Sequence, residues 1–119
     1  MKKPIKLPEP IETYIRGVNA GNPDILESAF AGDAVVSDVG PPIHGLAAIM
    51  SWAEREIFSV SVLLRVMDVA DRDGETIVTV KVDGTFDRTG LPSPLIMQQG
   101  FTLADGKIAT LTCRLATGG

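Results

Sequence analysis

Three polar side chains belong to segments whose other residues are mainly apolar, and together they could move a proton beside a carbonyl group. Asp38 ends a short apolar run, Tyr14 lies in an apolar helical stripe, and Gln99 interrupts the apolar face of a β pattern. A desolvated carboxylate can act as a base, while a phenol and an amide can hold the resulting oxyanion. If the three side chains converge, they form a proton-transfer site. If they do not, each is a buried polar group hydrogen-bonded to the backbone.

Five further residues are candidate ligand contacts, and each also has a simpler structural interpretation. The only histidine, His44, either lines the mouth of a cavity or contacts backbone beside a helix. Trp52 either contacts a ligand or packs between helices or subunits, and Gln99 could instead mark a bulge beside Gly100. The candidate contacts are His44, Trp52, Phe86, Met97 and Phe101.

The sequence contains none of the motifs that would indicate a bound metal or nucleotide cofactor. The glycine-rich phosphate loops, the H-E-x-x-H zinc motif and paired cysteines are all missing. A single histidine and a single cysteine, Cys113, exclude a multi-histidine or thiolate metal cage and a disulfide within the chain. We therefore expect chemistry without a metal or a cofactor.

The first half of the chain predicts three helices that could position these side chains. Apolar residues at helical spacing over residues 11–18 predict a helix that ends near Gly21. Asn22 and Pro23 are typical of the cap and first residue of a second helix. A third helix is expected over roughly residues 46–57.

Alternating patterns predict strands over residues 34–38, 60–70, 75–86, 95–104 and 107–115. Pro41 and Pro42 end the first of these strands, and Asp105-Gly106 is typical of a two-residue hairpin turn. We expect Gly84 and Gly100 to mark bends or bulges that curl the sheet. The predicted fold is α+β, with three N-terminal helices packed on a strongly curved, mostly antiparallel sheet that forms a cone around an apolar cavity.

Composition supports a single folded domain and disfavours two classes of partner. The chain has 119 residues, of which 45% are hydrophobic and 22% charged, and we expect an arm over residues 1–8 and one domain over residues 9–117. The net charge of −4 argues against nucleic-acid binding. No apolar run is long enough to span a bilayer, so we expect a cytoplasmic protein that does not bind membranes.

Three segments carry a resemblance to a known superfamily. Tyr14–Gly21, Phe30–Gly40 and Gly45–Trp52 resemble the N-terminal half of the nuclear transport factor 2-like superfamily. Within it, the sequence is most similar to SnoaL-like polyketide cyclases and Δ5-3-ketosteroid isomerases. The resemblance runs from about Ile11 to Leu115, by pattern more than by identity in the strand half. It implies a cone-shaped fold, which is often paired into homodimers through the outer faces of the sheet.

The resemblance also implies roles for the three polar residues. Ketosteroid isomerases use an aspartate as the proton-shuttling base, with a tyrosine and a protonated aspartic acid as oxyanion donors. Asp38 matches the base, Tyr14 matches the tyrosine, and Gln99 holds the place of the second acid. A glutamine amide is a far weaker acid, and Tyr14 is the chain's only tyrosine, so the chain departs from the isomerase pattern.

These observations leave three hypotheses open. In the leading one, a small cofactor-free protein binds an apolar carbonyl compound, polyketide- or steroid-like, and Asp38 moves a proton while Tyr14 and Gln99 polarise the carbonyl. In the second, a non-catalytic domain binds a hydrophobic ligand or only dimerises. In the third, Asp38 serves a hydration or dehydration reaction, with a water held by His44 or Gln99. Leu63 and Met67 on an outer sheet face favour a homodimer.

Overall fold

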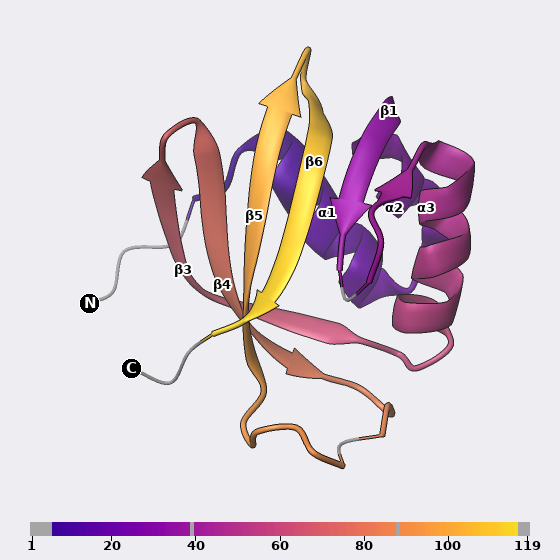
Figure 1. Cartoon of the computed structure of the whole chain (residues 1–119), viewed down its shortest axis with the longest axis vertical. Coiled ribbons are helices and arrows are strands. Elements are labelled where there is room, and N and C mark those ends of the chain that lie inside the picture. The colour runs from indigo at the N-terminus through magenta and orange to yellow at the C-terminus, as the bar shows by residue number, and fades with distance from the viewer. Residues whose placement is uncertain (1–5, 39, 88, 117–119) are drawn as a thin grey trace.

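The computed structural model, which describes residues 6–38, 40–87 and 89–116, combines three α-helices with one six-stranded sheet (Figure 1). This confirms the predicted α+β class. Residues 1–5 of the expected arm, and residue 117 of the expected domain, lie outside the described residues. In chain order the elements are α1 (Glu9–Ala20), α2 (Pro23–Ser28), β1 (Phe30–Ser37), β2 (Ile43–His44), α3 (Leu46–Ala53), a π-helical turn η1 (Glu54–Phe58), β3 (Leu63–Arg72), β4 (Glu75–Asp83), β5 (Ile96–Ala104) and β6 (Lys107–Leu115).

The end of α1 and the beginning of α2 lie at the residues that the sequence indicated. Gly21 ends α1 in the left-handed conformation, with a φ of 63°, which glycine adopts without strain. The side chain of Asn22 caps α2 by accepting hydrogen bonds from the backbone N–H groups of Asp24 and Ile25, at 3.0 and 3.2 Å. The predicted third helix is α3 together with η1.

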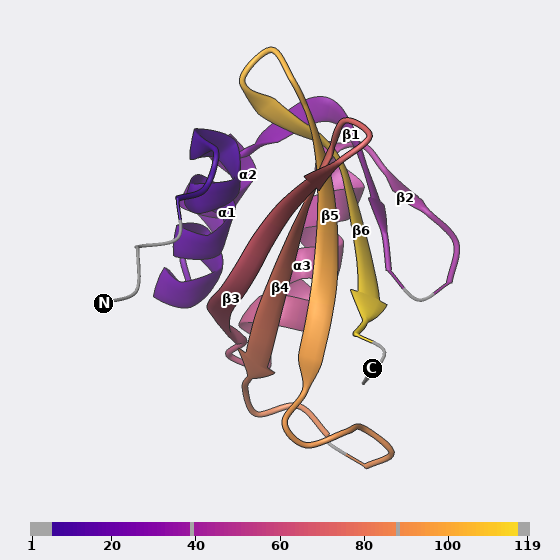
Figure 2. The same ribbon diagram turned by 90° about the vertical axis from the view of Figure 1, so that its left-hand side faces the viewer.

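The strands form one curved sheet in the order β2-β1-β6-β5-β4-β3. All neighbouring strands are antiparallel except β1 and β6, which are parallel. Figure 2 shows α3 behind this sheet, with α1 and α2 beside it. The helices therefore cover one face of the sheet. The buried side chains of the helices and of the strands meet between them.

Two local predictions differ from the structure. The first strand is longer than predicted, because β1 begins at Phe30 and pairs with β6, so that Asp38 directly follows its last residue. Gly100 is not a bulge, since it pairs in regular register with both Ile77 and Thr112. The missing side chain of Gly100 instead makes room for the side chain of Glu75.

Among the described residues, no helix is long and apolar enough to cross a membrane.

Helix α1 is attached to the far edge of the sheet by the side chain of Asn19. Its amide donates to the carbonyl oxygen of Leu64 at 2.9 Å and accepts from the N–H of Leu64 at 2.7 Å. Both backbone groups of Leu64 are thereby paired through one side chain. This fixes the position of α1, and hence of Tyr14, over the sheet.

Helices α1 and α2 approach so closely at Gly17 that a larger residue would not fit. A Cβ atom at Gly17 would lie 2.6 Å from the backbone nitrogen of Leu26. We expect Gly17→Ala to lower the free energy of unfolding by about 2 kcal/mol, because the strain exceeds the roughly 1 kcal/mol gained from alanine in a helix. Urea denaturation measures the change.

Gly32→Ala is the matched control for this substitution. Gly32 is exposed in β1, and a Cβ atom there would meet nothing within 4 Å. We expect its free energy of unfolding to stay within about 0.5 kcal/mol of the unmodified chain. Equal stability of the Gly17→Ala and Gly32→Ala variants would contradict the close helix contact.

Candidate functional site

The three polar residues singled out in the sequence line one cavity inside the curved sheet. The cavity measures about 150 Å³ and lies between α1, the α3–η1 helix and the inner faces of β3 to β6. Its lining combines apolar side chains with several polar groups, which can orient a small molecule. The lining residues are Tyr14, Val18, Asp38, Trp52, Glu56, Ile57, Val62, Leu64, Val82, Met97, Gln99 and Cys113.

Asp38 reaches the cavity because it continues the inward-facing alternation of β1. Ala34 and Val36 of that strand are fully buried, and Asp38 is the next residue on the same side. Its carboxylate oxygen Oδ2 accepts a hydrogen bond of 3.2 Å from the indole N–H of Trp52 on α3. Trp52 is almost fully buried, so this bond holds the half-buried carboxylate against the cavity wall.

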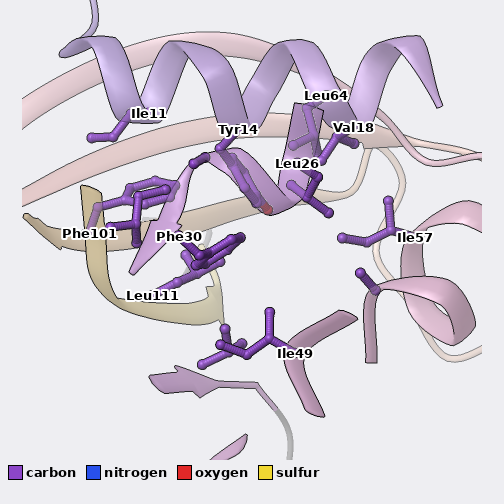
Figure 3. Close-up of a cluster of buried hydrophobic side chains, with 14 of the residues drawn as sticks. Ile11, Tyr14, Val18, Leu26, Phe30, Ile49, Ile57, Leu64, Phe101 and Leu111 are labelled. Carbon is purple, nitrogen blue, oxygen red and sulfur yellow. The ribbon is translucent and has the colours of Figure 1, made fainter. Parts of the chain in front are cut away.

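Tyr14 points from α1 into the core, where two aromatic rings hold it (Figure 3). Its ring makes edge-to-face contacts with Phe30 and Phe101, with centroids 6.1 and 5.3 Å apart. Burial raises the pKa of Tyr14 well above its ordinary range, and the negative charges of Cys113 and Asp38, when present, raise it further. The phenol therefore keeps its proton and can donate it in a hydrogen bond.

Gln99 and Cys113 face each other on the neighbouring strands β5 and β6. The amide nitrogen of Gln99 donates to the sulfur of Cys113 at 3.7 Å. The amide also acts on the phenol, where it lowers the pKa of Tyr14 without offsetting the effect of burial. Within the described part of the chain, the amide oxygen Oε1 of Gln99 is buried and has no hydrogen-bond partner.

A larger outer cavity of about 470 Å³ adjoins the inner one and shares part of its lining, including Asp38, Glu56 and Met97. Phe86 lines this outer space, as do Arg55 and Asp87. The acidic Asp38, Glu56 and Asp87 outnumber the single Arg55, so the entrance carries net negative charge. The inner cavity is thus reached through an acidic entrance with apolar walls.

Two of the predicted ligand contacts are placed elsewhere by the structure. His44 is exposed on β2, because β2 pairs Val36 with Ile43 and so turns the next residue to the outer face of the sheet. Phe101 is fully buried and packs against the ring of Tyr14, and it lines neither the inner nor the outer cavity. Tyr14, Asp38, Gln99, Trp52 and Met97 line the inner cavity, and Phe86 lines only the outer one.

Two polar residues of the cavity wall, Glu56 and Cys113, were not predicted from the sequence. Cys113 had a usable signal, since it follows the fully buried Leu111 by two residues in β6 and therefore shares its face. Glu56 had none, because it is an exposed residue of the π-helical turn η1. No three His, Cys, Asp or Glu side chains in the described ranges are grouped to hold a metal ion.

The thiol of Cys113 should be unreactive in the folded protein. Burial raises the pKa of Cys113 to about 12, and the nearby Asp38 carboxylate adds to this, while the Gln99 amide opposes it. Because only the thiolate reacts, we expect alkylation by iodoacetamide at pH 8 to be at least about 100-fold slower than for a free cysteine.

Alkylation in concentrated urea is the control for this prediction. Unfolding should restore the rate of an ordinary cysteine, which shows that the protection comes from the fold. A folded protein that alkylates at the free rate at pH 8 would contradict the burial of the thiol.

Comparison with known proteins identifies the fold. A candidate polyketide cyclase from Sinorhizobium meliloti is 30% identical, with a TM-score of 0.80 over 91% of this chain and 95% of that one. A candidate polyketide cyclase from Xanthomonas campestris pv. campestris is 25% identical, with a TM-score of 0.72 over 88% of this chain and 86% of that one. The Δ5-3-ketosteroid isomerase from Mycobacterium sp. shares the fold at 16% identity, with a TM-score of 0.70 over 89% of each chain.

A comparison with curated protein sequences finds no match. The model of the SnoaL-like domain family matches residues 11–111, which include Tyr14, Asp38 and Gln99. This confirms the resemblance inferred from the sequence, and the nuclear transport factor 2-like fold with it. The chain belongs to the SnoaL-like domain family.

Proposed function

We propose that this protein binds a neutral, apolar carbonyl compound, polyketide- or steroid-like, and moves a proton at the carbon beside the carbonyl. The observation that carries the proposal is the position of Asp38, Tyr14 and Gln99 in the wall of one cavity that also has apolar walls. This arrangement supplies a carboxylate base, a protonated phenol and an amide within one small space. The reaction class is that of a cofactor-independent isomerase or cyclase.

The proposed mechanism assigns the proton transfer to Asp38 and the hydrogen bond to the carbonyl oxygen to Tyr14. The carboxylate of Asp38 takes a proton from the carbon next to the carbonyl, and the electron pair of that C–H bond moves to form the enolate. The hydroxyl of Tyr14 donates a hydrogen bond to the carbonyl oxygen, which gains negative charge. Asp38 then returns the proton to carbon. Trp52 acts as a positioning residue, because its N–H fixes one carboxylate oxygen.

The sizes and charge of the two cavities support a neutral ligand that places one end in the inner cavity and the rest in the outer cavity. A cavity of about 150 Å³ is comparable to one that takes a single benzene ring. One ring of the compound would therefore occupy the inner cavity, and the rest would lie in the outer cavity of about 470 Å³. The acidic entrance disfavours ligands with a carboxylate or phosphate group.

The comparisons support the same class of compound. The similar protein from Sinorhizobium meliloti is a candidate polyketide cyclase, and the isomerase from Mycobacterium sp. has the same fold. Another structure of this fold, TerC at 16% identity and a TM-score of 0.75, was crystallised with polyporic acid. Because one fold hosts many reactions, the proposal depends on the cavity residues rather than on these neighbours.

Deuterium exchange into a bound ketone tests the proposal. We expect the full chain to bind cyclohexanone or 1-tetralone, detected by ligand NMR, and to accelerate the loss of the protons beside the carbonyl in D₂O. Heat-inactivated protein and buffer alone give the background rate. Binding without faster exchange would favour the non-catalytic ligand-binding alternative. Neither binding nor exchange with any cyclic ketone would reject the proposal.

We also propose that the protein is a homodimer, paired through the outer face of its sheet. Leu63 and Met67 of β3 are exposed, with 52% and 51% of their surface accessible. Met67 lies where the register between β3 and β4 shifts, next to the paired residue Val66. We expect sedimentation equilibrium at micromolar concentration to give twice the chain mass, and Met67→Lys to give a monomer. A monomer without substitution would reject this arrangement.

A further inference from the structure

The amide oxygen of Gln99 is a buried hydrogen-bond acceptor that the described residues leave unpaired. Gln99 is only 5% exposed and lines the inner cavity, and its Oε1 atom has no partner. Leaving a buried acceptor unpaired is unfavourable, so native structures almost always pair such groups. The free acceptor therefore points to a donor that a bound molecule supplies.

The neighbouring donors are already committed to other atoms. The indole N–H of Trp52 donates to Asp38. The amide nitrogen of Gln99 itself donates to Cys113. The Gln99 amide is also close enough to the Tyr14 phenol to lower its pKa. The Gln99 nitrogen is thus held within the wall, and the oxygen remains.

We propose that Oε1 of Gln99 accepts a hydrogen bond from a hydroxyl group on the ligand. The compound would then carry a phenolic or enolic hydroxyl on the ring that enters the inner cavity, in addition to a carbonyl group. This deepens the proposed function, on which it rests, by naming a feature of the substrate. It also changes the role of Gln99 from polarising a carbonyl to selecting a hydroxyl.

Three one-ring probes of similar size separate these roles. Phenol both donates and accepts hydrogen bonds, cyclohexanone only accepts, and toluene does neither. For the full chain we expect phenol to bind at least as tightly as toluene, although phenol is much better solvated by water. In Gln99→Met, which keeps the side-chain length, we expect phenol affinity to fall about tenfold or more, while the affinities for cyclohexanone and toluene change less than threefold.

Met97→Leu is the matched control, because Met97 lines the same cavity without an amide. We expect it to change the affinities for phenol and toluene by the same factor. Gln99→Leu repeats the test without the sulfur of methionine. The ratio of the phenol affinity to the toluene affinity of the unmodified chain is a further test that requires no substitution. Isothermal titration calorimetry or ligand-observed NMR gives all these affinities.

The outcomes separate this inference from the proposed function. If cyclohexanone binds and Gln99→Met leaves phenol affinity unchanged, the hydroxyl role is wrong while the carbonyl proposal stands. The same conclusion follows if Gln99→Met lowers the affinity for cyclohexanone by as large a factor as the affinity for phenol. If phenol binding depends on Gln99 but no ketone binds, the hydroxyl site stands and the carbonyl proposal fails. Failure of all three probes to bind rejects both.

Discussion

Asp38→Asn is expected to reduce the rate of proton exchange beside a bound ketone by at least about 100-fold. Asparagine has the same shape and can still accept the hydrogen bond from the Trp52 indole, but it cannot take up a proton at neutral pH. Removal of a general base typically costs a factor of 10² to 10⁴ in rate. Ketone affinity should change less than threefold, because the cavity keeps its shape. The NMR exchange assay in D₂O measures the rate, and titration with the same ketone measures the affinity.

Asp33→Asn provides the matched control for this experiment. Asp33 lies on the same strand, β1, but is exposed and lines neither the inner nor the outer cavity. We expect it to exchange protons at the rate of the unmodified chain. If Asp38→Asn keeps the full rate, or if both variants lose it equally, Asp38 is not the base.

Alkaline pH is expected to destabilise the folded protein through Tyr14 and Cys113. Burial raises both pKa values in the folded state, that of Cys113 to about 12, whereas their ordinary values are 10.0 and 9.0. Above pH 9 the unfolded chain releases protons that the folded chain retains, so stability that is fully present at neutral pH is lost as the pH rises. Each group contributes roughly 1 kcal/mol per pH unit once the pH exceeds its unfolded pKa.

Urea denaturation between pH 8 and pH 11 in the presence of a reductant measures this loss. We expect the free energy of unfolding to fall by about 3 kcal/mol over this range, a large part of the 5 to 15 kcal/mol typical of a domain. The double variant Tyr14→Phe, Cys113→Ala removes both groups and should show a much smaller decline. The lysines titrate equally in both proteins and cancel in the comparison. Equal slopes would show that neither group is buried in its neutral form.

The central residues of the site were predictable because each lies on an apolar face of a regular element. Tyr14 shares a helical stripe with Ile11 and Val18, and Gln99 alternates with Met97. All apolar faces of a small domain must meet in one core, so polar residues on those faces are brought together. This reasoning makes convergence of Tyr14, Asp38 and Gln99 one of the two outcomes expected from the sequence, and the cavity lining shows that the three lie together.

The remaining features depend on register and on local helix geometry, which the pattern of one sequence does not determine. His44 faces outward because of the register between β1 and β2, and a two-residue strand has no alternation to show it. Leu103 alternates with Phe101 and pairs with the fully buried Ile108, yet 38% of its surface is accessible near the end of β5. The π-helical turn similarly brings Glu56 to the cavity wall.

A crystal structure of the complex with 1-tetralone tests the central claim most directly, because it shows where the ketone binds relative to Asp38 and Tyr14. We predict that the ketone oxygen lies within hydrogen-bond distance of the Tyr14 hydroxyl, with the adjacent CH₂ group next to the carboxylate of Asp38. A ketone bound outside the cavity, or inside it with its carbonyl turned away from Tyr14, would contradict the proposed site.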